Sequence, residues 1–162
     1  KGGEGVPASL SAPAFPSPHA ASLDAPAAAL RGKRALVAED NEINMEIAEF
    51  MLVNEGAAVR KAVNGQQAVE MFSASEPGEI DVILMDVMMP VMDGLEATRR
   101  IRGLNRPDAR TIPIFAMTAN AFADDAERSR SAGMNEHLTK PIDAAVLTRT
   151  IARYVRGREV SP

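Results

Sequence analysis

Side chains able to hold a metal ion and a phosphoryl group follow short apolar runs at four places in the chain. Glu39 and Asp40 follow ALVA, Asp86 follows VILM, Thr118 follows IFAM, and Lys140 ends a fourth run. If these runs are parallel strands, their carboxyl ends share one edge of a sheet, where such proteins keep their chemistry. Three carboxylates, a hydroxyl and an ammonium at that edge predict a divalent-metal site that accepts a phosphoryl group.

The three carboxylates need a cation, because unpaired acids at one edge repel one another and raise one another's pKa. Oxygen ligands without His or Cys favour a hard ion, so we expect Mg²⁺, with Mn²⁺ as the alternative. Asp86 is the candidate nucleophile, since a carboxylate can form an acyl phosphate when a metal and a lysine offset the charge. Lys140, held extended or in a turn by Pro141, would neutralise the phosphoryl oxygens, and Thr118 would donate its hydroxyl to one of them.

Each of these residues taken alone has a plainer interpretation. Asp40 or Asp86 can simply cap the helix that follows it, and Thr118 can cap a helix starting near Ala121. Lys140 can form a salt bridge to one of the acids, which is compatible with the same chemical role at rest. The combination of all five positions at one edge favours the chemical interpretation.

The elements that must position these residues follow from the alternation of apolar and amphipathic segments after Arg34, which is typical of βα units around a parallel sheet. We expect strands at residues 34–38, 58–62, 82–85, 114–117 and 136–139, and helices at 43–54, 65–74, 95–103, 121–132 and 143–156. This pattern predicts an α/β, flavodoxin-like (βα)5 doubly wound sandwich, with a five-stranded parallel sheet in the order 2-1-3-4-5. Right-handed crossovers then put every strand's carboxyl end on the same edge.

Two of the expected helices carry one apolar face, as helices packed on a sheet do. The first shows Ile43, Ile47, Phe50 and Met51, and the last shows Leu147, Ile151, Tyr154 and Val155.

Composition bounds the remaining possibilities. The chain has 162 residues, a net charge of -4 and no cysteine, which excludes disulfides and thiolate sites and gives no electrostatic footprint for nucleic acid. No apolar run approaches the length of roughly 20 residues that a membrane span needs.

Residues 1–30 hold nine alanines and five of the eleven prolines, which predicts a flexible linker before a domain at 31–158 and a short tail at 159–162. The chain begins at Lys1 rather than Met, which is compatible with a piece of a longer protein.

Four segments closely resemble the receiver domain of two-component response regulators: AEDNEIN, LMDVMMPVMDG, MTANAF and GMNEHLTKPID. The resemblance runs from about Lys33 to Arg156. It implies that Asp86 is the phosphoacceptor, Asp40 a direct Mg²⁺ ligand, Glu39 a second acid that often acts through water, and the backbone carbonyl of Met88 a further ligand.

The same resemblance implies a conformational switch. Thr118 and Lys140 match the family's switch hydroxyl and its lysine, and His137 occupies the aromatic switch position three residues before that lysine. The family usually has Asp where this chain has Glu39, a departure that should alter metal geometry slightly. It frequently has Tyr or Phe where this chain has His137, and a lone histidine on an edge strand is as often a solvated surface group.

As a receiver, the chain would accept a phosphoryl group on Asp86 from the phosphohistidine of a histidine kinase or phosphotransfer domain, and would be no enzyme beyond that self-modification. The new charge would draw in Thr118 and shift the surface formed by the fourth helix, fifth strand and fifth helix. Partners would read that surface, and Met88 and Asn120 would influence the slow hydrolysis that resets it. We expect a cytoplasmic segment that makes no membrane contact, although the parent chain is free to carry an anchor. A weak or phosphorylation-dependent dimer is compatible with this role.

The residues after Arg156 are too few for an output domain. The NEIN run and the Ala/Pro leader resemble hybrid histidine kinases, so we favour a hybrid's C-terminal receiver over a stand-alone regulator. Rival functions are a Mg²⁺-dependent phosphohydrolase, which would usually carry a second Asp where Met88 stands, a nucleotide-binding module, and an unphosphorylated scaffold. The signalling interpretation further expects the carboxyl of Asp86 to face open solvent beside residues 39 and 40.

Overall fold

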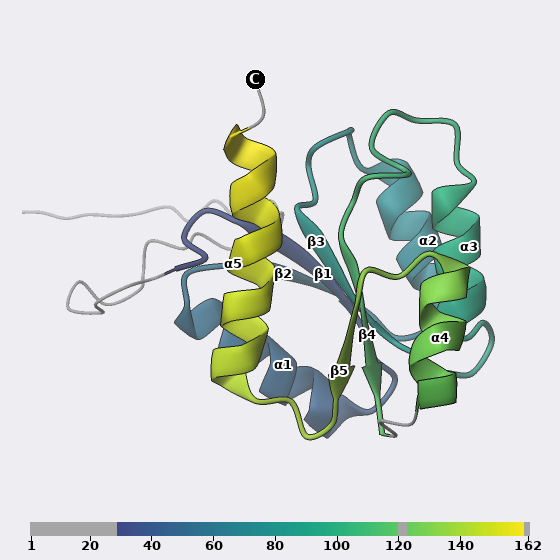
Figure 1. Cartoon of the computed structure of the whole chain (residues 1–162), viewed down its shortest axis with the longest axis horizontal. Coiled ribbons are helices and arrows are strands. Elements are labelled where there is room, and N and C mark those ends of the chain that lie inside the picture. The colour runs from purple at the N-terminus through teal and green to yellow at the C-terminus, as the bar shows by residue number, and fades with distance from the viewer. Residues whose placement is uncertain (1–28, 120–122, 161–162) are drawn as a thin grey trace, which may run out of the picture.

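The computed structural model describes residues 29–119 and 123–160 as a five-stranded parallel sheet between two layers of helices (Figure 1). The strands, in the order β2-β1-β3-β4-β5, are β1 (Arg34–Ala38), β2 (Ala58–Ala62), β3 (Val82–Asp86), β4 (Ile114–Thr118) and β5 (Glu136–Thr139). The helices are α1 (Glu42–Asn54), α2 (Gly65–Ala74), α3 (Gly94–Arg102), α4 (Ala123–Ala132) and α5 (Ala144–Val160). The predicted fold and strand order are confirmed. None of the described helices has the length and apolar character that crossing a membrane requires.

Two hydrophobic clusters hold the layers together, one on each face of the sheet. Because successive strand residues point to opposite faces, Leu36 and Ile83 pack with Phe72 under α2, α3 and α4, whereas Val37 and Leu84 pack under α1 and α5. The central strands β1, β3 and β4 are therefore apolar on both faces, as buried parallel strands must be.

Asparagine and aspartate side chains start the first three helices. The side-chain oxygens of Asn41, Asn64 and Asp93 each accept a hydrogen bond from the backbone N–H three residues on, at 2.8–2.9 Å. Such caps satisfy N–H groups that have no partner inside the helix. The loops after β1, β2 and β3 thus each end at a capping residue, and the next helix begins directly after it.

The predicted boundaries differ from the observed ones by a few residues. Asp86 and Thr118 are the last residues of β3 and β4 rather than the first residues after them. α5 continues to Val160, and the predicted start of the fourth helix at residue 121 lies outside the described residues, as do residues 1–28 of the predicted linker. Leu30, which the sequence placed in that linker, is 1% exposed and packs in the cluster under α1 and α5.

The expected apolar face of α1 is wrong for Ile43, Ile47 and Phe50, which are exposed, whereas Met51 is partly buried against the core. The residues that α1 buries against the sheet are Met45, Ala48 and Leu52, while Ile43 and Phe50 are 68% and 69% exposed. α1 carries apolar residues on both sides, and the sheet covers only one of them. The corresponding prediction for α5 is confirmed for Leu147, Ile151 and Val155, which are buried, while Tyr154 is partly buried.

Val91, in the loop between β3 and α3, has a strained backbone. Its φ is +72°, and the Met92 N–H donates to the Pro90 carbonyl at 2.7 Å across it, which makes a γ-turn of the rare, positive-φ form. A β-branched residue in this region costs about 1–2 kcal/mol. The Val91 side chain is 79% exposed, so packing within the described domain does little to offset that cost.

Arg106 fastens the connection between α3 and β4 to the end of α2. Its guanidinium donates to the carbonyls of Phe72 and Ser75 at 2.6 and 2.9 Å, pairs with Asp108 at 2.6 Å, and lies 4.1 Å from the centre of the Phe72 ring. The Arg106 and Asp108 side chains are only 11% and 8% exposed. This ion pair is therefore part of the interior and not a surface contact.

Arg106→Met should destabilise the domain by about 2–4 kcal/mol, because it removes the only cation paired with the buried carboxylate of Asp108 among the described contacts and takes one donor from each of the Phe72 and Ser75 carbonyls. Urea unfolding followed by circular dichroism measures the change. Arg99→Met is the control, because Arg99 makes an exposed pair with Glu96 on α3 and its loss should cost no more than about 0.5 kcal/mol. Equal losses in the two variants would show that the Arg106 contacts carry no stability.

Candidate functional site

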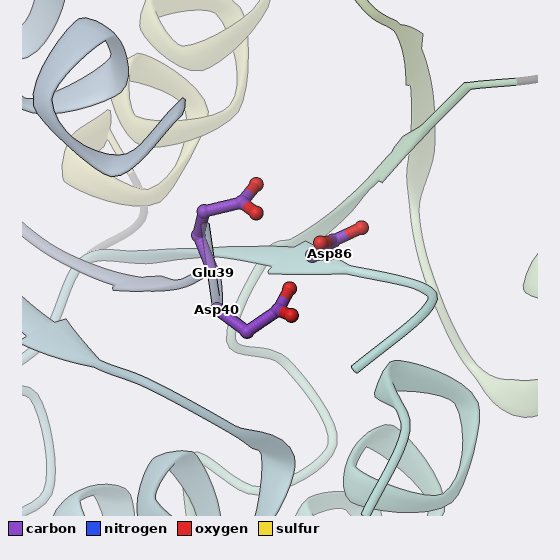
Figure 2. Close-up of side chains that lie close together, drawn as sticks. All are labelled: Glu39, Asp40 and Asp86. Atoms are coloured by element: carbon purple, nitrogen blue, oxygen red, sulfur yellow. The ribbon is translucent and has the colours of Figure 1, made fainter. Parts of the chain in front are cut away.

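The three predicted acids meet at the carboxyl ends of β1 and β3. Figure 2 shows Glu39 and Asp40 extending from the end of β1 toward Asp86 at the end of β3. One carboxylate oxygen from each residue can be chosen so that all three lie within 4.8 Å of one another. Glu39 and Asp86 are buried, whereas Asp40 is exposed. The site therefore has two buried carboxylates and one solvated carboxylate.

The strand register explains this convergence. β1 pairs with β3 so that Ala38 lies beside Met85, which puts the next residue of each strand, Glu39 and Asp86, side by side. Neither Asp40 nor Asp86 is a helix cap, since Asn41 and Asp93 cap α1 and α3. The plainer interpretation of these two acids is thus excluded.

Thr118 and Lys140 reach the same edge from β4 and β5. Asp86 pairs with Met117 in the sheet, so Thr118 follows directly at the end of β4, where it is 7% exposed. The Lys140 N–H donates to the Thr118 carbonyl at 2.8 Å. All five predicted positions are therefore at one edge, as the sequence indicated.

Lys140 forms the predicted salt bridge, and it does so with two acids. Its Nζ lies 3.0 Å from Glu39 Oε1 and 3.3 Å from Asp86 Oδ2. Although burial lowers it, the two carboxylates hold the pKa of Lys140 above its usual value. The ammonium therefore stays charged between the two buried carboxylates of Glu39 and Asp86.

The expectation that the Asp86 carboxyl faces open solvent is wrong. Asp86 is 4% exposed, because β3 extends through it and Lys140 lies against its carboxylate. Burial raises the pKa of Asp86, the charge of Glu39 raises it further, and Lys140 offsets part of the rise, so that the pKa lies at about 6. The carboxyl does lie beside residues 39 and 40, as expected.

Three features of the site were not predicted from the sequence. Glu39 Oε2 accepts from the Asn41 N–H at 3.1 Å, so the longer side chain also supports the start of α1. Gly94 begins α3 directly against β3, where a Cβ atom would collide with the Asp86 carbonyl. A small cavity of about 60 Å³ beside the site is lined in part by Ile47, Lys140 and Ile142. The Asp-Gly pair at 93–94 was a usable signal for the second contact.

The predicted switch residue His137 lies away from the acids, on β5 beside Ala116 of β4. It is half-buried and lines a cavity of about 130 Å³ between α4 and β5, together with Arg130, Met134 and Glu136. His137 is therefore not a fully solvated surface group.

The donor set suits a hard divalent cation. Three carboxylates supply only oxygen ligands, and one of them is solvated, which matches the preference of Mg²⁺ for a few carboxylates and retained water. The net charge of three acids and one lysine leaves the site negative, so that a cation would stabilise it.

The sequence model of the family described as the response regulator receiver domain matches residues 35–152 of the chain. The chain belongs to the response regulator receiver family. The resemblance noted in the sequence is thereby confirmed, and the fold of this receiver agrees with the solved structures of the family.

Several relatives place this receiver among two-component proteins. The receiver domain of the sensor histidine kinase PA1611 from Pseudomonas aeruginosa is 40% identical, with a TM-score of 0.70 over 77% of this chain and 98% of that one, and its structure holds a magnesium ion in the active-site cleft. The receiver of Saccharomyces cerevisiae Ssk1, crystallised with the histidine phosphotransfer protein Ypd1, is 27% identical, with a TM-score of 0.70 over 80% of this chain and 92% of that one. Hybrid signal transduction histidine kinase I of Dictyostelium discoideum is 37% identical over 74% of this chain but only 7% of its own length. This receiver therefore spans a small part of that relative.

Asp86→Asn should stabilise the metal-free receiver at about pH 8 by roughly 1–3 kcal/mol. The folded-state pKa of about 6 lies above the ordinary aspartate value of 3.8, so the ionised carboxylate is destabilising above pH 6. The advantage should shrink as the pH falls toward about 5, because the wild-type carboxyl then takes up its proton. Urea unfolding in EDTA at both pH values measures this difference.

Asp93→Asn provides the matched control, since Asp93 is an exposed cap and Asn caps a helix equally well. A wild type as stable as Asp86→Asn at about pH 8 would contradict the proposed destabilisation by the buried charge.

Proposed function

We propose that this receiver takes a phosphoryl group onto Asp86 from a phosphohistidine in a two-component phosphorelay. The observation that carries the proposal is the Asp86 carboxylate, which lies beside the Glu39–Asp40 pair and 3.3 Å from the ammonium of Lys140. A nucleophile in this position has one cation next to it and, within reach, carboxylates that could hold a second. Those are the groups that transfer to a carboxylate requires.

In the transfer step, a carboxylate oxygen of Asp86 forms a bond to phosphorus while the N–P bond of the phosphohistidine breaks. The imidazole nitrogen leaves with the electron pair and is protonated from solvent, and Asp86 becomes an acyl phosphate. Lys140, now shared by two carboxylates, would pair with a phosphoryl oxygen, and Thr118 would donate its hydroxyl to another.

Glu39, Asp40 and Asp86 would hold Mg²⁺, or Mn²⁺ in its place, with the backbone carbonyl of Met88 as a further ligand. Bound there, the ion would neutralise charge on the phosphoryl oxygens. Glu39 is anchored by Lys140 and by the Asn41 N–H, which supports a role for it through water, and Asp40 is the solvated residue best placed for direct ligation.

The receiver would catalyse only the modification and the reset of its own Asp86. The Met88 side chain is 77% exposed two residues beyond Asp86, a position from which it can limit water access to the acyl phosphate. Asn120, the other residue expected to influence hydrolysis, lies outside the described residues. Position 88 is Met, whereas a phosphohydrolase would usually carry a second Asp there. The sequence at this position therefore does not favour a phosphohydrolase.

Phosphorylation would then change the α4-β5-α5 surface. Thr118 would move toward the phosphoryl group, and His137 would shift in response. The cavity between α4 and β5 supports this step, because it borders His137 and gives the ring space to change position. Such a shift would bias an existing equilibrium of that surface.

The exposed apolar residues of α1 are the proposed docking surface for the donor. We call Ile43, Ile47, Phe50 and Val53 the α1 face; their exposed fractions range from 45% to 69%. A patch of this kind is unfavourable in water and typical of an interaction site. Ile47 also lines the cavity next to Lys140, so the α1 face continues to the acids. The solved complex of the Ssk1 receiver with Ypd1 supports a histidine phosphotransfer or kinase domain as the occupant.

The parent protein is proposed to be a hybrid histidine kinase, and a stand-alone regulator is the alternative. The similarity to the Dictyostelium hybrid kinase supports the first context. We also propose a cytoplasmic location for this receiver. The absence of cysteine fits a reducing compartment.

Acetyl phosphate with Mg²⁺ should add a single phosphoryl group to the receiver, detected by intact mass and removed by hydroxylamine. Asp86→Asn should gain none, and EDTA should prevent the modification of the wild type. Asp93→Asn, which changes an acid of the next loop, should be modified normally. An unchanged wild-type mass at saturating donor would exclude the phosphoacceptor role and favour a scaffold.

Ile43→Ser should slow phosphoryl transfer from phosphorylated Ypd1 at least about tenfold, which corresponds to about 1.4 kcal/mol of lost contact. Modification by acetyl phosphate should stay within about twofold of wild type, because that donor needs no docking surface. Val146→Ser on α5 is the control, since Val146 is also exposed but lies outside the α1 face. Normal transfer by Ile43→Ser would remove α1 from the docking surface.

A further inference from the structure

Met88 is the one exposed methionine in the part of the chain that the structure describes. The chain has nine methionines, and all nine lie in that part. The Met88 side chain is 77% exposed, whereas four of the others are buried and four are partly buried against the two hydrophobic clusters. The buried ones are Met45, Met85, Met117 and Met134, and the partly buried ones are Met51, Met71, Met89 and Met92. A thioether that meets solvent freely is therefore found at a single position.

This thioether is the most accessible sulfur for an oxidant, since the chain has no cysteine to compete with it. With hydrogen peroxide, a sulfur lone pair attacks one peroxide oxygen and the O–O bond breaks. The second oxygen leaves as hydroxide, takes the proton of the transferred hydroxyl and becomes water. Sulfur gives two electrons to the peroxide, and the product is methionine sulfoxide. Methionine sulfoxide reductases reverse the step with two electrons from a dithiol, which return the oxygen as water.

The position of Met88 connects this sulfur to the phosphoacceptor. Met88 lies two residues beyond Asp86, and its backbone N–H donates to Asp86 Oδ1 at 3.4 Å. The residue that carries the exposed thioether therefore lies against the carboxyl that water must reach to reset the receiver. Oxidation there would leave the core intact, because the other methionines of this loop, Met89 and Met92, are the ones that pack against the cluster under α2, α3 and α4.

We propose that reversible oxidation of Met88 to its sulfoxide by a hydroperoxide shortens the lifetime of the acyl phosphate on Asp86. This inference rests on the proposed function, in which the Met88 side chain limits water access. The thioether is apolar, whereas the sulfoxide is polar and its oxygen accepts hydrogen bonds, so that it would hold water beside the acyl phosphate. Hydrolysis would then be faster. The receiver would respond to an oxidant as well as to its phosphodonor.

The first measurement locates the oxidation. The whole chain is treated with hydrogen peroxide, the reaction is stopped with catalase, and tandem mass spectrometry of peptides gives the rate of oxygen addition at each methionine. Met88 should be oxidised at least about fivefold faster than Met89 and Met92 of the same loop, because their sulfurs are less exposed. Faster oxidation of any other methionine would overturn the assignment of Met88.

The second measurement follows the acyl phosphate. Oxidised and untreated receivers are phosphorylated with acetyl phosphate and Mg²⁺, the donor is removed, and intact mass records the loss of the phosphoryl group. The oxidised wild type should lose it at least about threefold faster, and methionine sulfoxide reductases for both epimers with a dithiol should restore the slower rate. Met88→Leu should hydrolyse at one rate with or without peroxide, since leucine carries no sulfur. Met92→Leu, the control from the same loop, should respond to peroxide as the wild type does.

The outcomes separate this inference from the function on which it rests. An unchanged or longer acyl phosphate lifetime in the oxidised wild type would overturn the inference and leave the phosphoacceptor role of Asp86 intact. An equal response to peroxide in Met88→Leu would also overturn it, because the effect would then come from another residue. Loss of phosphorylation in the oxidised protein alone would do the same, since the sulfoxide would then block transfer. No phosphoryl group on the untreated wild type would overturn both the inference and the proposed function.

Discussion

The buried ion pairs of Lys140 with Glu39 and Asp86 are the constraint around which this receiver is organised. They join the end of β5 to the ends of β1 and β3, so a single side chain spans four of the five strands in the observed order. One ammonium does not balance two buried carboxylates and the solvated carboxylate of Asp40. Removing charges from water is costly even when they are paired. The sheet therefore holds an unbalanced negative site, and the hydrophobic clusters on its two faces supply the stability that keeps it in place.

The sequence predicted the sheet and its edge well, because that information is local. Parallel strands that are buried on both faces read as short apolar runs, and Asp86 and Thr118 mark where those runs end. It failed for α1, because Ile43, Met45, Phe50 and Leu52 place apolar groups on both sides of one helix. Periodicity alone cannot decide which side the sheet covers.

Other features depended on distant parts of the chain and left no local signal. The burial of Asp86 follows from Lys140, which lies 54 positions further along the chain (140 − 86). Leu30 joins the core because its N–H reaches the Glu55 carbonyl at the end of α1. The solvent exposure expected for Asp86 and the linker expected at Leu30 were wrong for the same reason: each residue's environment is created by a segment that the local pattern does not include.

The Arg106 guanidinium turns the connection between α3 and β4 into part of the interior. Its donors reach the carbonyls of Phe72 and Ser75 at the end of α2 and the carboxylate of Asp108, so the position of Arg106 is fixed. The number of residues between the end of α3 and Arg106 therefore has little freedom to change. Related receivers that keep the arginine should therefore show few insertions or deletions here. Length variation over evolutionary time should gather instead in surface connections that hold no such internal anchor.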